Sequence, residues 1–279
     1  MLVGSKESKI KNHYKFKNKK FSRSKYIVDD TPLGGWDLPT KHIYPIVTGP
    51  SITPFRVSQC DEFCIIPYDE KDTSKPIDIQ TFMSKDKRLF DYLLNHQELI
   101  NKQSEKSKKM RRGNEFYSLS KIGPYTFSKY MVAARDNTKF CASVIKDSIT
   151  PWGERKQSIC VKHTIIISRT KKGRFITENE AHYISGILNS DVIVEYIQST
   201  FKSNGYSLKK AHFCLPEYDE ANSNHKKIYK LAKKASQSKS VQEIKKIQTE
   251  ISDLYLEICA NDQISCLLYT SDAADDRIS

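Results

Sequence analysis

The sequence lacks the features of membrane and secreted proteins. No apolar run approaches the roughly 18 to 20 residues that a helix needs to cross a bilayer. The basic N-terminus is not followed by an apolar segment, which excludes a secretory signal peptide. The seven cysteines are odd in number and irregularly spaced, so they predict reduced thiols rather than a disulfide framework. We expect a cytoplasmic protein with no membrane partner.

Glycine-rich turns and Pro-Pro dipeptides are also missing. The ten glycines are scattered, and none forms the strand-following turn through which a backbone approaches S-adenosylmethionine. Adenine-N6 methylation also uses an Asn/Asp/Ser-Pro-Pro-Tyr/Phe loop, in which an aromatic ring stacks on the flipped base. The tripeptides at residues 66–68 and 123–125 resemble this loop only superficially. We therefore expect no catalytic residue and no bound cofactor in this chain.

Positive charge, in contrast, is abundant. The chain has 46 lysines and arginines against 33 aspartates and glutamates, a net charge of +13. Lysines and arginines that neutralise phosphates release condensed counterions, so such a surplus favours a polyanionic partner. Nucleic acid is the leading interpretation, and an anionic membrane surface is the alternative. Much of the charge lies in residues 1–30, 102–112 and 171–174.

The basic segments supply the candidate DNA contacts. We expect lysines to contact phosphates and so position the protein on the duplex. Arginines are better suited to base edges, because the guanidinium fork pairs with O6 and N7 of guanine. For each segment the alternative is a solvated charged face. The candidate DNA-binding residues are Lys108, Lys109, Arg111, Arg112, Lys129, Arg135, Lys171, Lys172 and Arg174.

Two other sites are open to interpretation. Asp147, Glu154 and Lys156 resemble the carboxylates and lysine that hold Mg²⁺ in restriction endonucleases. No strand pattern frames these three residues, so a solvated turn is the simpler interpretation. A zinc site is the second possibility, but closely spaced CxxC pairs are missing and buried free cysteines often act as small apolar groups. Its candidate ligands are Cys60, Cys64, Cys160, His163, His212 and Cys214.

The periodicity of apolar residues predicts an α+β fold, with small mixed sheets, flanking helices and a C-terminal helical hairpin. Thr177 with Glu180, and Ser240 with Glu243, have the spacing of capping boxes that begin helices. We expect strands within residues 26–68, 117–144, 160–168 and 206–216. We expect helices over residues 78–107, 177–188, 191–201, 225–235 and 241–259.

Several segments, taken in order, resemble the TaqI-like C-terminal specificity domains. They are residues 43–55, 63–68, 89–94, 116–119, 123–132, 181–190 and 212–225. The most specific is residues 181–190, where a helix ends in Leu188-Asn189-Ser190 before a second helix. Each motif is loose by itself, and their shared order carries the resemblance.

The resemblance implies the target-recognition domain of a bacterial adenine-N6 DNA methyltransferase from a restriction–modification system. It implies double-stranded DNA as one partner and a catalytic methyltransferase domain as the other, in the same polypeptide or as a separate chain. S-adenosylmethionine is then the cofactor of the parent enzyme, and this chain alone is expected to be inactive. The alternatives are a specificity subunit for a separate methyltransferase, a divergent Mg²⁺-dependent restriction nuclease, and an intact small methyltransferase.

We divide the chain into four parts. Residues 1–30 form a basic leader, either a phosphate-binding arm or a solvated segment. Residues 31–220 form the target-recognition domain, and residues 221–260 form the C-terminal helical hairpin. Residues 266–279 resemble a translated sequencing adapter and break the apolar spacing of the preceding helix, so we expect them to be non-native. A natural disordered tail is the alternative.

Overall fold

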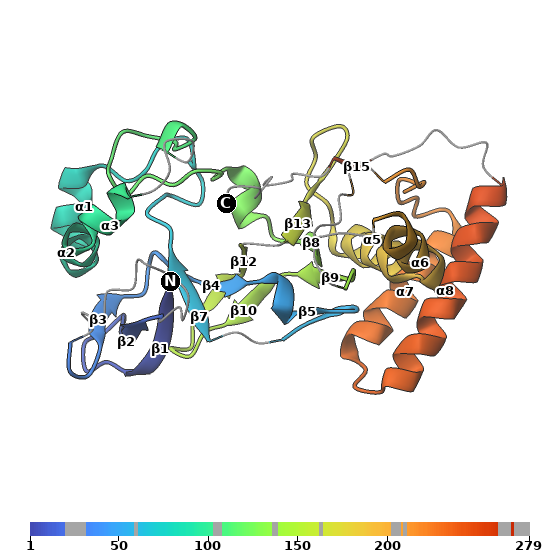
Figure 1. The fold of residues 1–279 in the computed structure, drawn as a ribbon, viewed down its shortest axis with the longest axis horizontal. Helices are drawn as coiled ribbons and strands as arrows, with labels where there is room; N and C mark the ends of the chain where they lie inside the picture. The colour runs from blue at the N-terminus through green and yellow to red at the C-terminus, as the bar shows by residue number, and fades with distance from the viewer. Residues whose placement is uncertain are drawn as a thin grey trace.

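The computed structural model has the predicted α+β architecture (Figure 1). It describes residues 1–19, 32–58, 61–102, 108–135, 139–161, 164–201, 208, 211–261 and 269–270. In the view of Figure 1, β-strands fill the centre and lower left, α1–α3 lie at the upper left, and α5–α8 form the right-hand end. Within the described chain, no helix combines the length and apolar content needed to span a membrane.

The largest sheet has six strands in the order β12-β4-β7-β1-β2-β3. The pair β12–β4 is parallel and the others are antiparallel. The strands are β1 (Leu2–Glu7), β2 (His13–Asn18), β3 (Trp36–Pro39), β4 (Ile43–Val47), β7 (Glu62–Ile65) and β12 (Ile159–Cys160).

The predicted basic leader is wrong for its described part, because residues 1–19 contribute β1 and β2 to this sheet. Apolar and basic residues alternate along β2, so that Tyr14 and Phe16 are buried while Lys17 is exposed. The prediction rested on the number of lysines in this segment and not on the two-residue alternation, which is typical of a strand with one buried face. Residues 20–31 lie outside the described part of the chain.

The single helix predicted for residues 78–107 is also wrong. The chain forms α1 (Ile79–Lys85), α2 (Lys87–Asn95) and α3 (Gln97–Asn101), with breaks at Asp86 and His96. Both residues have non-helical dihedral angles and bind partners outside their helices. The Asp86 carboxylate lies 3.4 Å from Nε2 of His42, and the His96 ring lies 3.2 Å from the amide of Asn18. Long-range polar contacts therefore interrupt the apolar stripe.

A second sheet has three strands in the order β13-β8-β9. These are β8 (Met131–Arg135), β9 (Ala142–Ile145) and β13 (Thr164–Ile167), and they confirm the strands predicted within residues 117–144 and 160–168. Short pairs surround this sheet. They are β5 (Ile52–Thr53) with β6 (Arg56–Val57), β10 (Asp147–Ile149) with β11 (Arg155–Gln157), and β14 (Arg169–Thr170) with β15 (Tyr269–Thr270).

The strand predicted for residues 206–216 is absent from its described part, Leu208 and residues 211–216. The alternation that suggested it is real, because Ala211, Phe213 and Leu215 are buried against the helices. Hydroxyl groups, rather than a neighbouring strand, bind two of its backbone groups. Tyr196 accepts from the amide of His212 at 2.9 Å, and Tyr255 donates to the carbonyl of Cys214 at 2.6 Å.

Four helices form the C-terminal end: α5 (Glu178–Asn189), α6 (Asp191–Thr200), α7 (Ser223–Gln237) and α8 (Val241–Asn261). The predicted helical hairpin is confirmed, since α7 and α8 are connected by residues 238–240 and pack side by side (Figure 1). The buried stripe of α8 joins the core under α5 and the second sheet. Both predicted capping boxes place a hydroxyl on an N3 amide, at 3.3 Å in each case.

Candidate nucleic-acid interface

Two hairpin turns, at residues 150–154 and 170–174, share one backbone geometry. Each turn begins with a threonine, Thr150 or Thr170, whose carbonyl accepts from the glycine amide three residues later at 2.9 Å. The amide of the same threonine donates to the carbonyl of the last residue of the turn, Glu154 or Arg174, at 2.8 Å. Gly153 and Gly173 have φ angles of 85° and 80°, which side chains with a Cβ rarely adopt. This is the three-residue hairpin loop closed by a glycine bulge. We call residues 150–154 the inner turn and residues 170–174 the outer turn.

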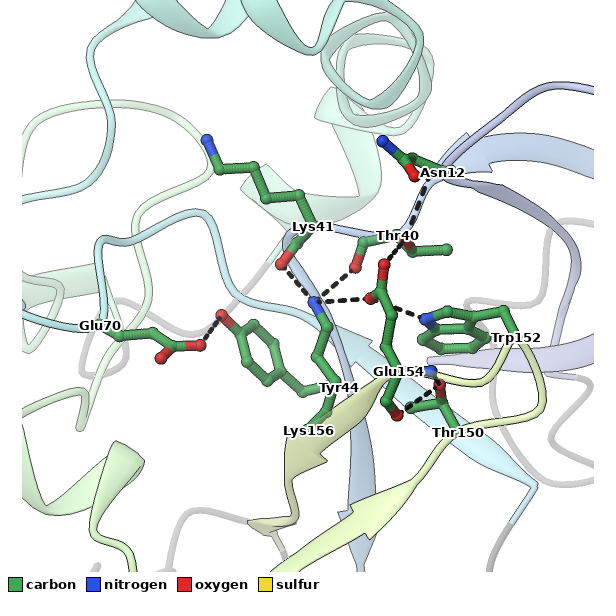
Figure 2. Close-up of polar contacts among 9 residues, drawn as sticks. All are labelled: Asn12, Thr40, Lys41, Tyr44, Glu70, Thr150, Trp152, Glu154 and Lys156. Carbon is green, nitrogen blue, oxygen red and sulfur yellow. Dashed lines mark hydrogen bonds and ion pairs between the residues drawn. The ribbon is translucent and has the colours of Figure 1, made fainter.

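The inner turn is anchored by Trp152. Its ring lies between 5.1 and 5.6 Å from the rings of Tyr14, Phe16 and Phe63 in the six-stranded sheet. Trp152 also donates from Nε1 to the carboxylate of Glu154 at 2.9 Å, as Figure 2 shows. The turn that the sequence suggested to be solvated is therefore packed on the first sheet.

Glu154 and Lys156 continue this anchor (Figure 2). Glu154 accepts from the Thr40 hydroxyl at 3.2 Å, and Lys156 Nζ lies 3.6 Å from Glu154. The same ammonium donates to the carbonyls of Thr40 at 2.9 Å and Lys41 at 2.6 Å. Burial lowers the pKa of Lys156, whose side chain is only 11% exposed. Lys156 thus fixes the loop before β4.

Tyr44 closes the other side of Lys156. The ammonium lies 4.9 Å from the centre of the Tyr44 ring, and the Tyr44 hydroxyl donates to Glu70 at 2.8 Å (Figure 2). Burial and the neighbouring Glu70 carboxylate raise the pKa of this phenol. The cluster is a network of satisfied groups, which stiffens the fold rather than presenting a reactive atom.

The register of β10 and β11 argues against the nuclease site. Asp147 pairs with Gln157, and Ser148 pairs with Lys156. Because neighbouring residues of a strand point to opposite faces, Asp147 lies on the face opposite to Lys156. Its carboxylate lies 3.3 Å from Arg155 instead. A strand hairpin does frame these residues, contrary to the sequence interpretation, but the carboxylates and the lysine do not converge.

The outer turn projects into solvent. Lys171, Lys172 and Gly173 are exposed at its tip. Arg174, predicted to contact DNA, donates two hydrogen bonds of 2.9 and 2.6 Å to the buried carboxylate of Glu180. Burial raises the pKa of Glu180, but hydrogen bonds from Arg174 and Thr177 bring it below its usual value. The two lysines are thus carried on a turn that is tied to the first turn of α5.

Sequence reasoning missed the stacking of Arg169 on Phe175. The guanidinium lies 4.4 Å from the centre of the ring, and the two residues form an antiparallel bridge at the base of the outer turn. Phe175 is nevertheless 40% exposed. The spacing around the turn could have predicted this contact, because residues 169 and 175 lie opposite one another when residues 171–173 form the loop.

The other basic segment, residues 108–112, is partly built into the fold. Arg111 donates from Nη2 to the carbonyl of Ile100 at 2.9 Å and bridges to Ser120. Its guanidinium is half-buried, whereas Lys109 and Arg112 are exposed. Lys108 is half-buried. The role predicted for Arg111 in base contact competes with this structural one. Residues 103–107 lie outside the described part of the chain.

Lys129 and Arg135 occupy two further places. Lys129 is exposed after the 3-10 helix η2 (Pro124–Phe127), 5.4 Å from the ring of Tyr130. Arg135 is half-buried at the end of β8. The nine candidates therefore belong to separate segments. In Figure 1 the green segment after α3 and the yellow turn between β13 and α5 both lie along the upper edge of the view.

No three histidine, cysteine or acidic side chains within the described residues are grouped to hold a metal ion. Of the candidate zinc ligands, Cys64 and Cys160 line an apolar cavity of about 310 Å³. Burial raises the pKa of both thiols to about 12, so they remain protonated. Cys60 and His163 lie outside the described residues.

A larger groove, of about 940 Å³, lies between the β9–β10 segment and the helices α5 and α7. Its charged wall includes Glu178, with Lys233 Nζ at 3.4 Å and His182 Nε2 at 4.0 Å. Burial lowers the pKa of His182 to about 4, so the ring is neutral at pH 7. The groove carries charges of both signs, which does not suit a polyanion.

The chain matches no protein-family model and no curated protein. Among the basic segments, the outer turn combines exposure, rigidity and charge of one sign.

Proposed function

We propose that this chain is the DNA-binding, target-recognition part of a site-specific adenine-N6 DNA methyltransferase of a restriction–modification system. The observation that carries the proposal is the outer turn, where Lys171 and Lys172 are exposed at the tip of a braced hairpin. The net charge of +13 supports it. A catalytic methyltransferase domain, in the same polypeptide or as a separate chain, would hold S-adenosylmethionine and perform the transfer. The complex would act on double-stranded DNA in the cytoplasm.

The contrast between the two turns supports this assignment. The inner turn uses the same backbone to pack Trp152 against Phe63, and its charged neighbours are hydrogen-bonded within the fold. The outer turn instead has two exposed lysines, Lys171 and Lys172, at its tip. A stiff hairpin loses little entropy on binding, so its phosphate contacts are gained at low cost.

Salt dependence of duplex binding tests the proposal. We expect affinity to fall steeply as salt rises, because each neutralised phosphate adds about 0.9 to the slope of log K against log salt concentration. Replacing Lys171 and Lys172 by alanine should weaken binding to all sequences and reduce the slope by about 2. The measurement is fluorescence anisotropy of a labelled duplex at several salt concentrations.

The matched control is the double substitution of Lys226 and Lys227, which are exposed on α7. It removes the same charge and leaves the outer turn intact. Equal losses in the two double variants would show that only net charge matters. A wild-type protein that ignores duplex DNA at low salt would refute the proposal.

A further inference from the structure

Phe175 is an exposed aromatic side chain held in a fixed position. Phe175 is 40% exposed, although phenylalanine is normally a core residue. The next residue, Ile176, is 4% exposed and donates from its amide to the carbonyl of Ser168 at 3.0 Å. The backbone below the ring is therefore anchored, and the ring stands at the edge of the buried core.

Arg169 holds the ring from the opposite strand of the hairpin. Its guanidinium lies 4.4 Å from the ring centre, a distance at which a cation is attracted to an aromatic face. The stacking covers part of the ring and restrains its rotation.

The outer turn is braced from the other side as well. Arg174 donates to the Glu180 carboxylate from both terminal guanidinium nitrogens, Nη1 and Nη2, and Glu180 also accepts from the amide of Thr177 at 2.7 Å. Glu180 belongs to the buried face of α5. Lys171, Lys172 and Phe175 are thus presented together on one rigid projection, with two cations at the tip and an apolar ring at the base.

We propose that this hairpin enters the major groove and that Phe175 recognises a thymine through its C5-methyl group. The inference rests on the proposed function and names its sequence-reading residue. The major groove admits an element as wide as a two-stranded β-ribbon, and residues 171–175 lie outside the pairing of β14 with β15. An apolar side chain against the thymine methyl is an established form of direct readout. Lys171 and Lys172 then contact the phosphates that flank the groove. The lysines set the register, and the ring supplies the preference for one base.

Removal of single methyl groups from the DNA tests the contact. The wild-type chain first selects its preferred duplexes from a pool with a randomised central segment. Each thymine of a selected duplex is then replaced, one at a time, by deoxyuridine, which lacks only the C5-methyl group. At one position we expect binding to weaken about fourfold, the factor that corresponds to burying one methyl-sized group.

Substitution of the ring completes the test. Phe175→Ala should lose the preference for thymine at that position and should bind the thymine and deoxyuridine duplexes equally. Phe175→Leu keeps an apolar side chain and should retain part of the preference. Leu256→Ala, at a side chain that is 51% exposed on α8, is the control and should behave as wild type. Circular dichroism and thermal unfolding confirm that each variant is folded.

The outcomes separate this inference from the proposed function. Suppose that Phe175→Ala still binds duplexes selectively and loses as much affinity on deoxyuridine substitution as wild type does. That result would overturn the role of Phe175 and leave the proposed function standing. The same holds if Phe175→Ala weakens all duplexes equally and wild type is insensitive to deoxyuridine. Preference for single strands would overturn the major-groove contact in favour of base stacking. Failure of wild type to bind any duplex would defeat the proposed function itself.

Discussion

Asn189 occupies the place that a neighbouring strand would fill at the edge of the three-stranded sheet. Its side-chain oxygen accepts from the amide of Ala142 at 2.9 Å, and its side-chain nitrogen donates to the carbonyl of Ala142 at 2.7 Å. The Asn189 side chain is fully buried. One amide thereby joins the C-terminal end of α5 to β9. The Leu-Asn-Ser motif, noticed only by resemblance, thus has a structural reason.

Replacing Asn189 by leucine should destabilise the fold by about 2 to 3 kcal/mol, because the buried amide of Ala142 loses its partner. The Ala142 carbonyl retains a hydrogen bond from the amide of Phe55 at 3.0 Å, which limits the loss. Urea denaturation measures the change in the free energy of unfolding. Asn114→Leu, at an exposed position, is the control and should change stability by less than about 0.5 kcal/mol. Equal effects of the two variants would contradict the role given to Asn189.

At the scale of elements, α5 and α7 approach each other closely at Gly186. A Cβ built on Gly186 would lie 2.8 Å from Cγ2 of Ile228 and 3.4 Å from the side chain of Ala232. Alanine in an exposed helix is favoured over glycine by about 1 kcal/mol, so helix propensity alone would replace this residue. The packing of α5 on α7 reverses that preference.

We expect Gly186→Ala to destabilise the protein by about 1 to 3 kcal/mol through overpacking. In an Ile228→Ala background the clashing methyl group is gone. The same glycine substitution should then be neutral or stabilising by up to about 1 kcal/mol. Urea denaturation of the four proteins of this double-mutant cycle gives the coupling energy. Additive effects would show that the two helices tolerate the extra carbon without contact.

In the inner and outer turns, too, tertiary packing adds to what the local sequence determines. Each contains threonine, two residues, glycine and a charged residue, and each adopts the same bulged loop. The tip residues differ. Pro151-Trp152 of the inner turn pack on the aromatic cluster through the tryptophan ring, whereas Lys171-Lys172 of the outer turn are exposed. Local sequence determined the shape of the loops, whereas the packing of Trp152 on the aromatic rings of the first sheet determined the position of one of them.

At the scale of the whole molecule, buried neutral histidines couple folding to pH. Burial, aided by the cations Lys233 and Lys146 and opposed by Glu178, lowers the pKa of His182 to about 4 from its ordinary 6.5. The unfolded chain therefore binds an additional proton between pH 6.5 and 4. The stabilisation is complete above about pH 6.5 and is lost as pH falls toward 4.

His182→Gln should remove this dependence. The difference between the ordinary pKa of 6.5 and the folded-state pKa of about 4 corresponds to about 3 kcal/mol. Wild type loses this much free energy of unfolding as pH falls from 6.5 to 4, and the variant does not lose it. His42, whose pKa burial also lowers to about 4, should leave part of the slope in the variant. Urea denaturation at several pH values measures the effect, with the exposed His212→Gln as control. Parallel pH profiles for wild type and His182→Gln would contradict the burial argument.

Part of the candidate site was visible in the sequence and part was not. The lysines of the outer turn could be identified because exposure at a glycine-containing loop follows from neighbouring residues. The engagement of Arg174 with Glu180 and of Arg111 with Ile100 could not, because a side chain's partner depends on where other segments pack. Phe175 escaped notice for the same reason, since its exposure is a property of the packed molecule.

The sequence by itself determined the α+β class, the capped starts of α5 and α8, the C-terminal hairpin and the excess of positive charge. These depend on periodicity and on contacts within a few residues. Only the tertiary structure decided that residues 1–19 join a sheet, that the predicted long helix breaks at Asp86 and His96, and that Asp147 faces away from Lys156. The physical reason is distance along the chain. Lys156 donates to a carbonyl 116 positions away, and no local pattern encodes such a partner.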